Sequence, residues 1–169
     1  KKRFGYNEIL LRAFVINDFI DSDWELRTVP VHNEQSLGKK ERKYGGRLNT
    51  SIIEFLKEFR NDEEKCNELK SFINDSIHKV QIVFNDDAFK RIDSNDASTS
   101  INKTIAELQL VTLSRFSENT IVEHKELIRE SFKKFLLDNT EIFLRATNNT
   151  ENVKRRYNWG KVLSSKIEG

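Results

Sequence analysis

The sequence predicts an all-α fold, an irregular bundle of about six to seven helices with a long basic loop after the first helix. Two observations favour this class. The 169 residues include only six glycines and one proline, which supply few turns for a fold built of many short strands. Apolar residues also recur at the three- and four-residue intervals of amphipathic helices. The length suits one domain, residues 1–169, that can bury a core.

The first helix is expected from about Tyr6 to Ile20, with Asn7 as its N-cap. Its apolar residues form two stripes, so we expect this helix to be covered on both sides. One stripe holds Tyr6, Ile9, Leu10, Ala13, Phe14 and Ile20, and the other holds Leu11, Val15 and Phe19.

Residues 21–48 form a long connection, because proline and glycines are scattered there among polar residues. Connections of this length are uncommon in compact domains and tend to be functional or disordered. Within it, residues 39–47 carry five positive charges and one negative charge, a local net charge of +4. The candidate phosphate contacts in this segment are Lys39, Lys40, Arg42 and Lys43.

Two helices are expected next, a short one from the N-cap Asn49 to about Asn61 and a longer one from about Asp62. The acidic opening of the longer helix complements the helix dipole. Its predicted core stripe is Cys66, Leu69, Ile73, Ile77, Val80 and Phe84. After residues 85–87, Phe89 and Ile92 should dock as apolar plugs before a polar turn over residues 93–100.

The remaining helices are predicted from about Ile101 to Phe116, from about Val122 to Asp138, and after residues 147–150. The first of these is apolar almost all round and is the best candidate for a central helix. A short helical turn is expected at about 141–145. The expected inward residues are Ile128, Phe132, Phe135 and Leu136 in the second helix and Val153, Tyr157, Gly160, Leu163 or Ser164, and Ile167 in the last.

Residues that usually carry catalysis are sparse. The three histidines are 46 residues apart in both gaps and show no metal-ligand spacing, and no glycine-rich phosphate loop occurs. We therefore assign no catalytic residue, no metal and no cofactor to this chain. No apolar run approaches the ~18 to 20 residues of a membrane span. With the single cysteine and the lack of a signal peptide, this favours a cytoplasmic location without a membrane partner.

A second basic cluster, Lys154, Arg155 and Arg156 with Lys161, lies near Tyr157 and Trp159. Positive charge beside exposed aromatic rings can bind nucleic-acid backbone and stack on bases. However, the whole chain has a net charge of only +2, and a charged cluster on a helix is usually a solvated face. Both interpretations remain open from the sequence.

Arg12 is a further candidate contact, because it lies in an otherwise apolar helix. A buried arginine would need a carboxylate or a phosphate as its partner. The alternative is that the guanidinium reaches solvent or pairs with Glu8, its i,i+4 neighbour.

The order of several motifs resembles the C-terminal helical part of the GmrSD-like restriction endonuclease N-terminal domain family, formerly a domain of unknown function. The motifs are Arg3-Phe4 and residues 8–14 (EILLRAF), 56–59 (LKEF), 83–91 (VFNDDAFKR), 101–103 (INK) and 152–156 (NVKRR). The resemblance spans nearly all 169 residues. Ser100 departs from it, because many relatives carry a basic residue there.

The resemblance implies a ParB/sulfiredoxin-like portion upstream, linked with nucleotide hydrolysis and DNA-directed, prokaryotic phage defence. Its Asp-Gly-Gln-Gln-Arg type motif is absent here, and the chain begins at Lys1 and contains no methionine. We therefore expect a fragment, a helical support segment that packs on the upstream portion and contacts DNA but is inert alone. Its parent would be an NTP-dependent nuclease. The alternative is a non-catalytic helical module that binds nucleic acid or a partner protein.

Overall fold

The computed structural model describes residues 2–31, 41–92 and 100–169. The fold is mostly helical, with 72% of the residues in helices, as the sequence predicted. These residues form six α-helices, two short strands and two 3-10 turns. The helices are α1 (Lys2–Phe19), α2 (Leu48–Phe59), α3 (Glu63–Phe84), α4 (Lys103–Ser114), α5 (Glu118–Asp138) and α6 (Thr150–Glu168). The 3-10 turns are η1 (Asn85–Asp87) and η2 (Thr140–Phe143).

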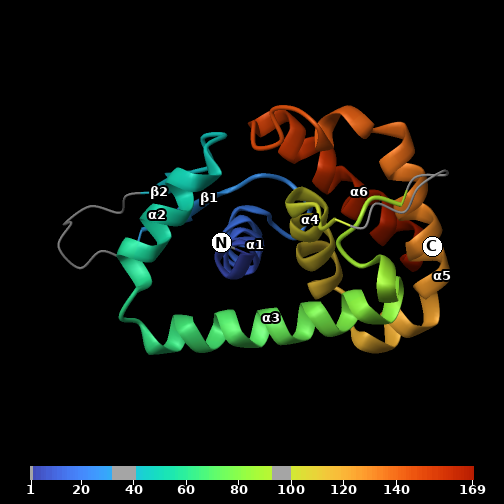
Figure 1. Cartoon of the computed structure of the whole chain (residues 1–169), viewed down its shortest axis with the longest axis horizontal. Coiled ribbons are helices and arrows are strands. Elements are labelled where there is room, and N and C mark those ends of the chain that lie inside the picture. The colour runs from blue at the N-terminus through green and yellow to red at the C-terminus, as the bar shows by residue number, and fades with distance from the viewer. Residues whose placement is uncertain (1, 32–40, 93–99) are drawn as a thin grey trace.

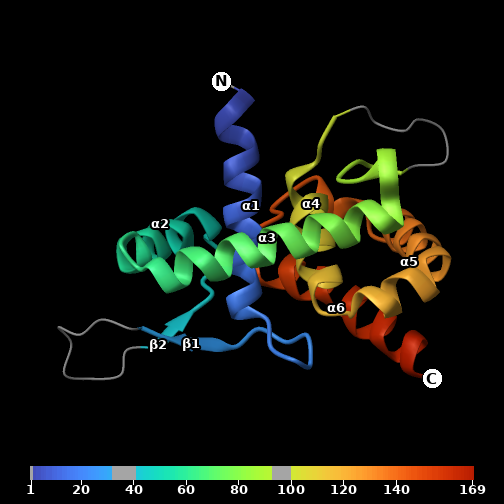
Figure 2. The ribbon, with the colours of Figure 1, turned by 90° about the horizontal axis from the view of Figure 1, so that it is seen from below.

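The long helix α3 extends along the molecule, and the other helices are grouped along it (Figure 1). Helix α2 and the strands lie at one end, and α5 and α6 lie at the other. In the turned view, α1 crosses α3 near the middle (Figure 2). Helix α4 packs against α1, α3 and α6, and every residue from Thr104 to Leu113 is buried. This confirms the prediction that the helix after residue 101 is central.

The connection predicted over residues 21–48 is not entirely irregular. Strands β1 (Thr28–Pro30) and β2 (Glu41–Lys43) pair in antiparallel register within it, and Val29 is buried against the core. Strands of three residues are too short to show the alternation by which strands are recognised in a sequence. The prediction of a loop was therefore wrong for these two segments.

Helix starts agree with the sequence only in part. Helix α3 begins next to Asp62, as predicted, and Asp62 caps it by accepting from the backbone N–H of Lys65. Helix α5 begins four residues before the predicted start, because the sequence analysis missed its cap, Ser117. Asn7 and Asn49 were wrongly predicted as N-caps, because both lie inside helices that begin earlier. For α2 the first helical residue is Leu48, which is 1% exposed, and the preceding residue makes no side-chain cap.

Of the predicted core stripe of α3, only the last two positions are fully buried. Val80 and Phe84 are buried, whereas Cys66 and Ile77 are exposed. The helix packs most closely on α4 and α5, and its first half extends beyond α4 toward α2 (Figure 1). The core therefore covers mainly the apolar side chains at the C-terminal end of α3.

The last two helices follow their predicted faces. Ile128, Phe132 and Leu136 of α5 are buried, as are Val153, Tyr157, Gly160 and Leu163 of α6. The plugs Phe89 and Ile92 pack half-buried against the core, as expected. The polar turn predicted after them falls almost entirely on residues 93–99, outside the described residues.

Candidate nucleic-acid interface

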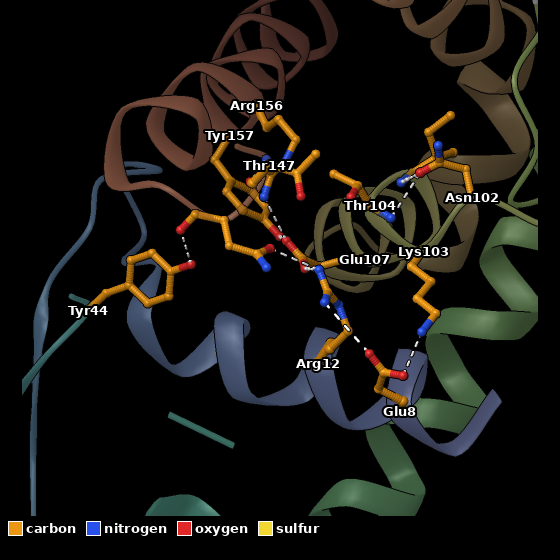
Figure 3. Close-up of polar contacts among 12 residues, drawn as sticks. Glu8, Arg12, Tyr44, Asn102, Lys103, Thr104, Glu107, Thr147, Arg156 and Tyr157 are labelled. Carbon is orange, nitrogen blue, oxygen red and sulfur yellow. Dashed lines mark hydrogen bonds and ion pairs between the residues drawn. The ribbon is translucent and has the colours of Figure 1, made fainter. Parts of the chain in front are cut away.

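A carboxylate without solvent exposure, Glu107 of α4, lies between two arginines (Figure 3). Arg12 of α1 donates from Nη2 to Glu107 Oε2 at 3.2 Å, and Arg156 of α6 donates from Nη2 to Oε1 at 3.1 Å. The hydroxyl of Tyr157 lies 3.5 Å from the same Oε1 atom. These four residues, the Glu107 cluster, join three helices through charges that water does not reach.

The Glu107 cluster also holds the turn that precedes α6. Arg156 donates to the carbonyl of Thr147, and Arg12 donates to Asn148 Oδ1 at 3.0 Å. Tyr44 donates from its hydroxyl to the Asn148 carbonyl at 2.6 Å. Burial, with a smaller contribution from Glu107, raises the pKa of Tyr157 well above its usual value, so this phenol stays a neutral donor.

Arg12 therefore has the carboxylate partner that its apolar surroundings require. Its second predicted partner, Glu8, is also present, with Oε1 3.8 Å from Nη1. Glu8 in turn pairs with Lys103 at 2.6 Å, at the exposed rim of the cluster. The guanidinium of Arg12 is engaged by Glu107, Asn148 and Glu8, and its contact with phosphate stays a prediction.

The predicted basic cluster on the last helix divides between two faces. Arg156 is fully buried in the Glu107 cluster, whereas Lys154 and Arg155 face solvent. Tyr157, which was predicted to face inward, is buried at 0% exposure, and Trp159 is buried at 2%, so neither ring is exposed beside the charges. Successive side chains of a helix point about 100° apart, so consecutive basic residues in the sequence can lie on different faces of the helix.

A groove of about 490 Å³ lies between α5 and α6, and Trp24 and Glu25 line it as well. It brings Lys154, Arg155 and Lys161 together with two lysines that the sequence analysis did not select. Its charged lining residues are the basic Lys134, Lys154, Arg155, Lys161 and Lys166 and the acidic Glu25 and Asp138. The groove thus has a local net charge of +3, while the whole chain has +2.

Aromatic rings and a glycine shape the groove. Phe135 of α5 is half-buried and stacks on Trp159 of α6, with ring centroids 6.1 Å apart. Trp159 is held in place by a hydrogen bond that its Nε1 donates to Ser131 Oγ at 3.1 Å. The indole of Trp24 lies directly on Gly160, where an added Cβ would come within 2.4 Å of the ring. Only glycine allows this close approach of the loop to α6.

Three of the groove cations already have acidic partners at the surface. Arg155 donates to Glu141 at 2.5 Å, Lys134 lies 3.2 Å from Asp138, and Lys161 lies 3.6 Å from Glu25. A hydrogen bond from its own backbone N–H, and then the bond from Arg155, lower the pKa of Glu141. Of the residues that the structure describes, none forms an ion pair with Lys154 or Lys166. These two cations remain available to an anionic ligand.

The other predicted basic segment lies far from the groove. Lys39 and Lys40 fall outside the described residues. Arg42 lies on β2 and pairs with Glu58 of α2 at 3.4 Å, and Lys43 is exposed. Strand β2 is at the opposite end of the molecule from α5 and α6 (Figure 1). The two predicted clusters therefore do not form one surface.

A second, polar cleft of about 510 Å³ lies beside the turn after α1. Burial raises the pKa of Asp18 there, and nearby Lys65 opposes that rise. Arg115 donates to the carbonyls of Ile20 and Asp21, and its guanidinium lies 4.8 Å from the Trp24 ring centroid. These contacts bind the turn to α4. Because the polar groups of this cleft are engaged with one another, we take the α5–α6 groove as the candidate site.

Within the described part of the chain, no group of three or more His, Cys, Asp or Glu side chains is placed to hold a metal ion. Among the described helices, none combines the length and apolar character required to span a membrane. No family model matches the chain, and no curated protein or solved structure is significantly similar to it.

Proposed function

We propose that this chain is a non-catalytic helical module that binds nucleic-acid phosphates along the α5–α6 groove, as the support segment of a GmrSD-like, DNA-directed defence protein. The observation that carries the proposal is the convergence of five basic side chains, from two helices, on one groove. Phosphate groups attract such a surface because binding releases the counterions that surround the nucleic acid.

The exposure of these cations also supports the proposal. Lys154 and Lys166 lie at the surface without an acidic partner among the described residues. Arg155, Lys134 and Lys161 pair with carboxylates that are themselves solvent-exposed. Surface pairs of this kind contribute little to stability, so an approaching phosphate can replace the carboxylate at small cost.

The resemblance to the GmrSD-like family supplies the remaining parts of the proposal. It implies that nucleotide hydrolysis belongs to an upstream ParB-like portion and that DNA is the shared target. A cytoplasmic location is consistent with that target. In this proposal the α5–α6 groove holds the DNA backbone while the chemistry occurs elsewhere in the parent protein.

The test is a titration of short labelled DNA, single-stranded and duplex, at low and at physiological salt, followed by fluorescence anisotropy. Binding is expected to weaken steeply with salt. The double variant Lys154→Ala/Lys166→Ala should reduce the slope of log K against log salt by about 1.4 for single strands and about 1.8 for duplex, because each lost phosphate contact removes ~0.7 or ~0.9.

The matched control is Lys57→Ala/Lys70→Ala, which removes two exposed lysines from α2 and α3 outside the groove. Its salt slope should equal that of the parent chain. ATP and GTP hydrolysis is followed in the same samples. Equal losses in both double variants would contradict a site in the groove. DNA binding that does not depend on salt would contradict phosphate contact, and turnover would contradict a non-catalytic module.

A further inference from the structure

The shape of the α5–α6 groove bears on which form of nucleic acid it takes. Its volume of about 490 Å³ falls within the range of pockets that enclose small ligands, ~300 to 1,000 Å³. A duplex presents mainly its phosphates and sugars to a protein and keeps the faces of its bases stacked inside. An unpaired nucleotide can place its base in such a pocket while its phosphates remain at the rim.

The lining of the groove includes an aromatic ring on which a base can stack. Phe135 is half-buried, and its ring is held by Trp159 on one side and by Phe143, with ring centroids 5.9 Å apart, on another. A ring that is already fixed loses little conformational entropy when a base stacks on it. Stacking of bases on aromatic side chains is the usual way in which proteins hold single strands.

Side-chain amides and cations surround this ring. The Asn158 amide lines the groove, is exposed, and forms no hydrogen bond with another described residue. It can therefore pair with the edge of an unpaired base. Lys154 and Lys166 are 12 residues apart on α6, about 18 Å at ~1.5 Å per residue, which leaves room for several phosphates of one strand.

From these observations we infer that the α5–α6 groove binds single-stranded nucleic acid, with one unpaired base stacked on Phe135 and phosphates of the same strand on Lys154 and Lys166. This inference rests on the proposed function and names the form of nucleic acid that the same groove selects. The inference explains why the groove lining combines an aromatic ring with basic side chains, since contact with phosphates alone does not require the ring.

The first experiment changes the ligand and leaves the protein intact. A labelled single strand is compared with the same sequence closed as a hairpin duplex and with a strand in which abasic sites replace the bases. The ordinary strand should bind about 5- to 140-fold more tightly than the abasic strand, since a stacked base contributes ~1 to 3 kcal/mol. Equal affinity for the ordinary and the abasic strand would overturn the inference.

The second experiment changes the ring. Phe135→Leu keeps an apolar side chain of similar size and should weaken binding of the single strand at least about fivefold, without a change for the duplex. Phe72→Leu, at a half-buried phenylalanine of α3, is the matched control and should change neither. Because Asn158 is exposed, Asn158→Ala tests the same pocket without disturbing the core, and it should also weaken the single strand selectively.

Phosphate contact and base stacking can be contradicted separately. If duplex and single strand bind equally, and Phe135→Leu and Asn158→Ala change neither, base stacking is wrong. Salt-dependent binding that Lys154→Ala/Lys166→Ala weakens would then still support phosphate contact. If no nucleic acid binds even at low salt, both proposals are wrong.

Discussion

The Glu107 cluster and the α5–α6 groove use the same kinds of side chain for different purposes. In the cluster, Arg12, Glu107 and Arg156 are buried and their charges are matched within the chain. In the groove, Lys154 and Lys166 are exposed and have no acidic partner among the described residues. A charge removed from water must find its partner when the chain folds, whereas a charge left in water can bind a later ligand.

Helix α6 takes part in both regions. Arg155 and Arg156 are neighbours in the sequence, yet Arg155 faces the groove and Arg156 faces the Glu107 cluster. The turn before α6 is held by the cluster, since Thr147 and Asn148 accept from its two arginines. The buried charges therefore set the position of the helix that carries the exposed ones.

The largest effect is expected from Glu107→Ala. It leaves Arg12 and Arg156 buried without their carboxylate, and loss of one partner from a buried ion pair typically costs about 3 to 5 kcal/mol of unfolding free energy. Urea denaturation measures this change. Glu123→Ala, on the exposed face of α5, is the control and should stay within about 0.5 kcal/mol of the parent. Similar losses of unfolding free energy in the two variants would contradict the distinction between buried and exposed charges.

Gly160→Ala tests the packing of α6 on the loop that carries Trp24. Alanine favours the helix by up to ~1 kcal/mol, but its Cβ would lie 2.4 Å from the Trp24 ring and overpacking costs ~1 to 3 kcal/mol. We expect a net loss of about 1 to 2 kcal/mol by urea denaturation. Gly45→Ala, where a Cβ meets no atom within 4 Å, should not be destabilising. A stabilised Gly160→Ala variant would show that Trp24 moves freely.

Asp18→Asn should give a smaller effect that depends on pH. Burial raises the pKa of Asp18 above 3.8, so the folded chain retains a proton that the unfolded chain releases. Stability from this group is therefore lost as the pH rises from the unfolded pKa through the folded pKa. The asparagine variant lacks this loss, and its advantage in unfolding free energy should grow between pH 4 and pH 7. An equal difference between the variant and the parent chain at pH 4 and at pH 7 would contradict this effect.

Arg155→Met should change stability least and binding most selectively. Its partner Glu141 is at the surface, so the thermal midpoint should not move measurably, while the salt slope for DNA should fall by about 0.7 to 0.9, equivalent to one phosphate. Arg156→Met, one residue later, is the comparison and should destabilise strongly because Glu107 loses a partner. If both variants behave alike, the assignment of the two faces is wrong.

Local patterns were sufficient to predict most of the helices. The stripe on α5, the inward face of α6 and the central position of α4 all follow from apolar spacing, because each reports which side of one helix is covered. The need of Arg12 for an ionic partner was also visible. The identity of the main partner, Glu107, was not, because it is 95 residues away and a single glutamate within an apolar helix does not indicate which helix it faces.

The candidate site was harder to predict for the same reason. Lys154, Arg155 and Lys161 were selected as a basic cluster, but Lys134 and Phe135 join them only because α5 packs beside α6. No spacing within α5 reveals that contact. The short strands were missed because three paired residues carry no detectable period, and β1 and β2 are separated by ten residues of sequence.

Both tryptophans of the chain, Trp24 and Trp159, line the α5–α6 groove, and both indoles are almost completely shielded from water. Indole emission responds to solvent and to aromatic rings stacked nearby, so all of the tryptophan fluorescence of this protein originates at the candidate site. The chain therefore contains its own optical probe, and occupation of the groove can be followed without a label on the protein or on the ligand.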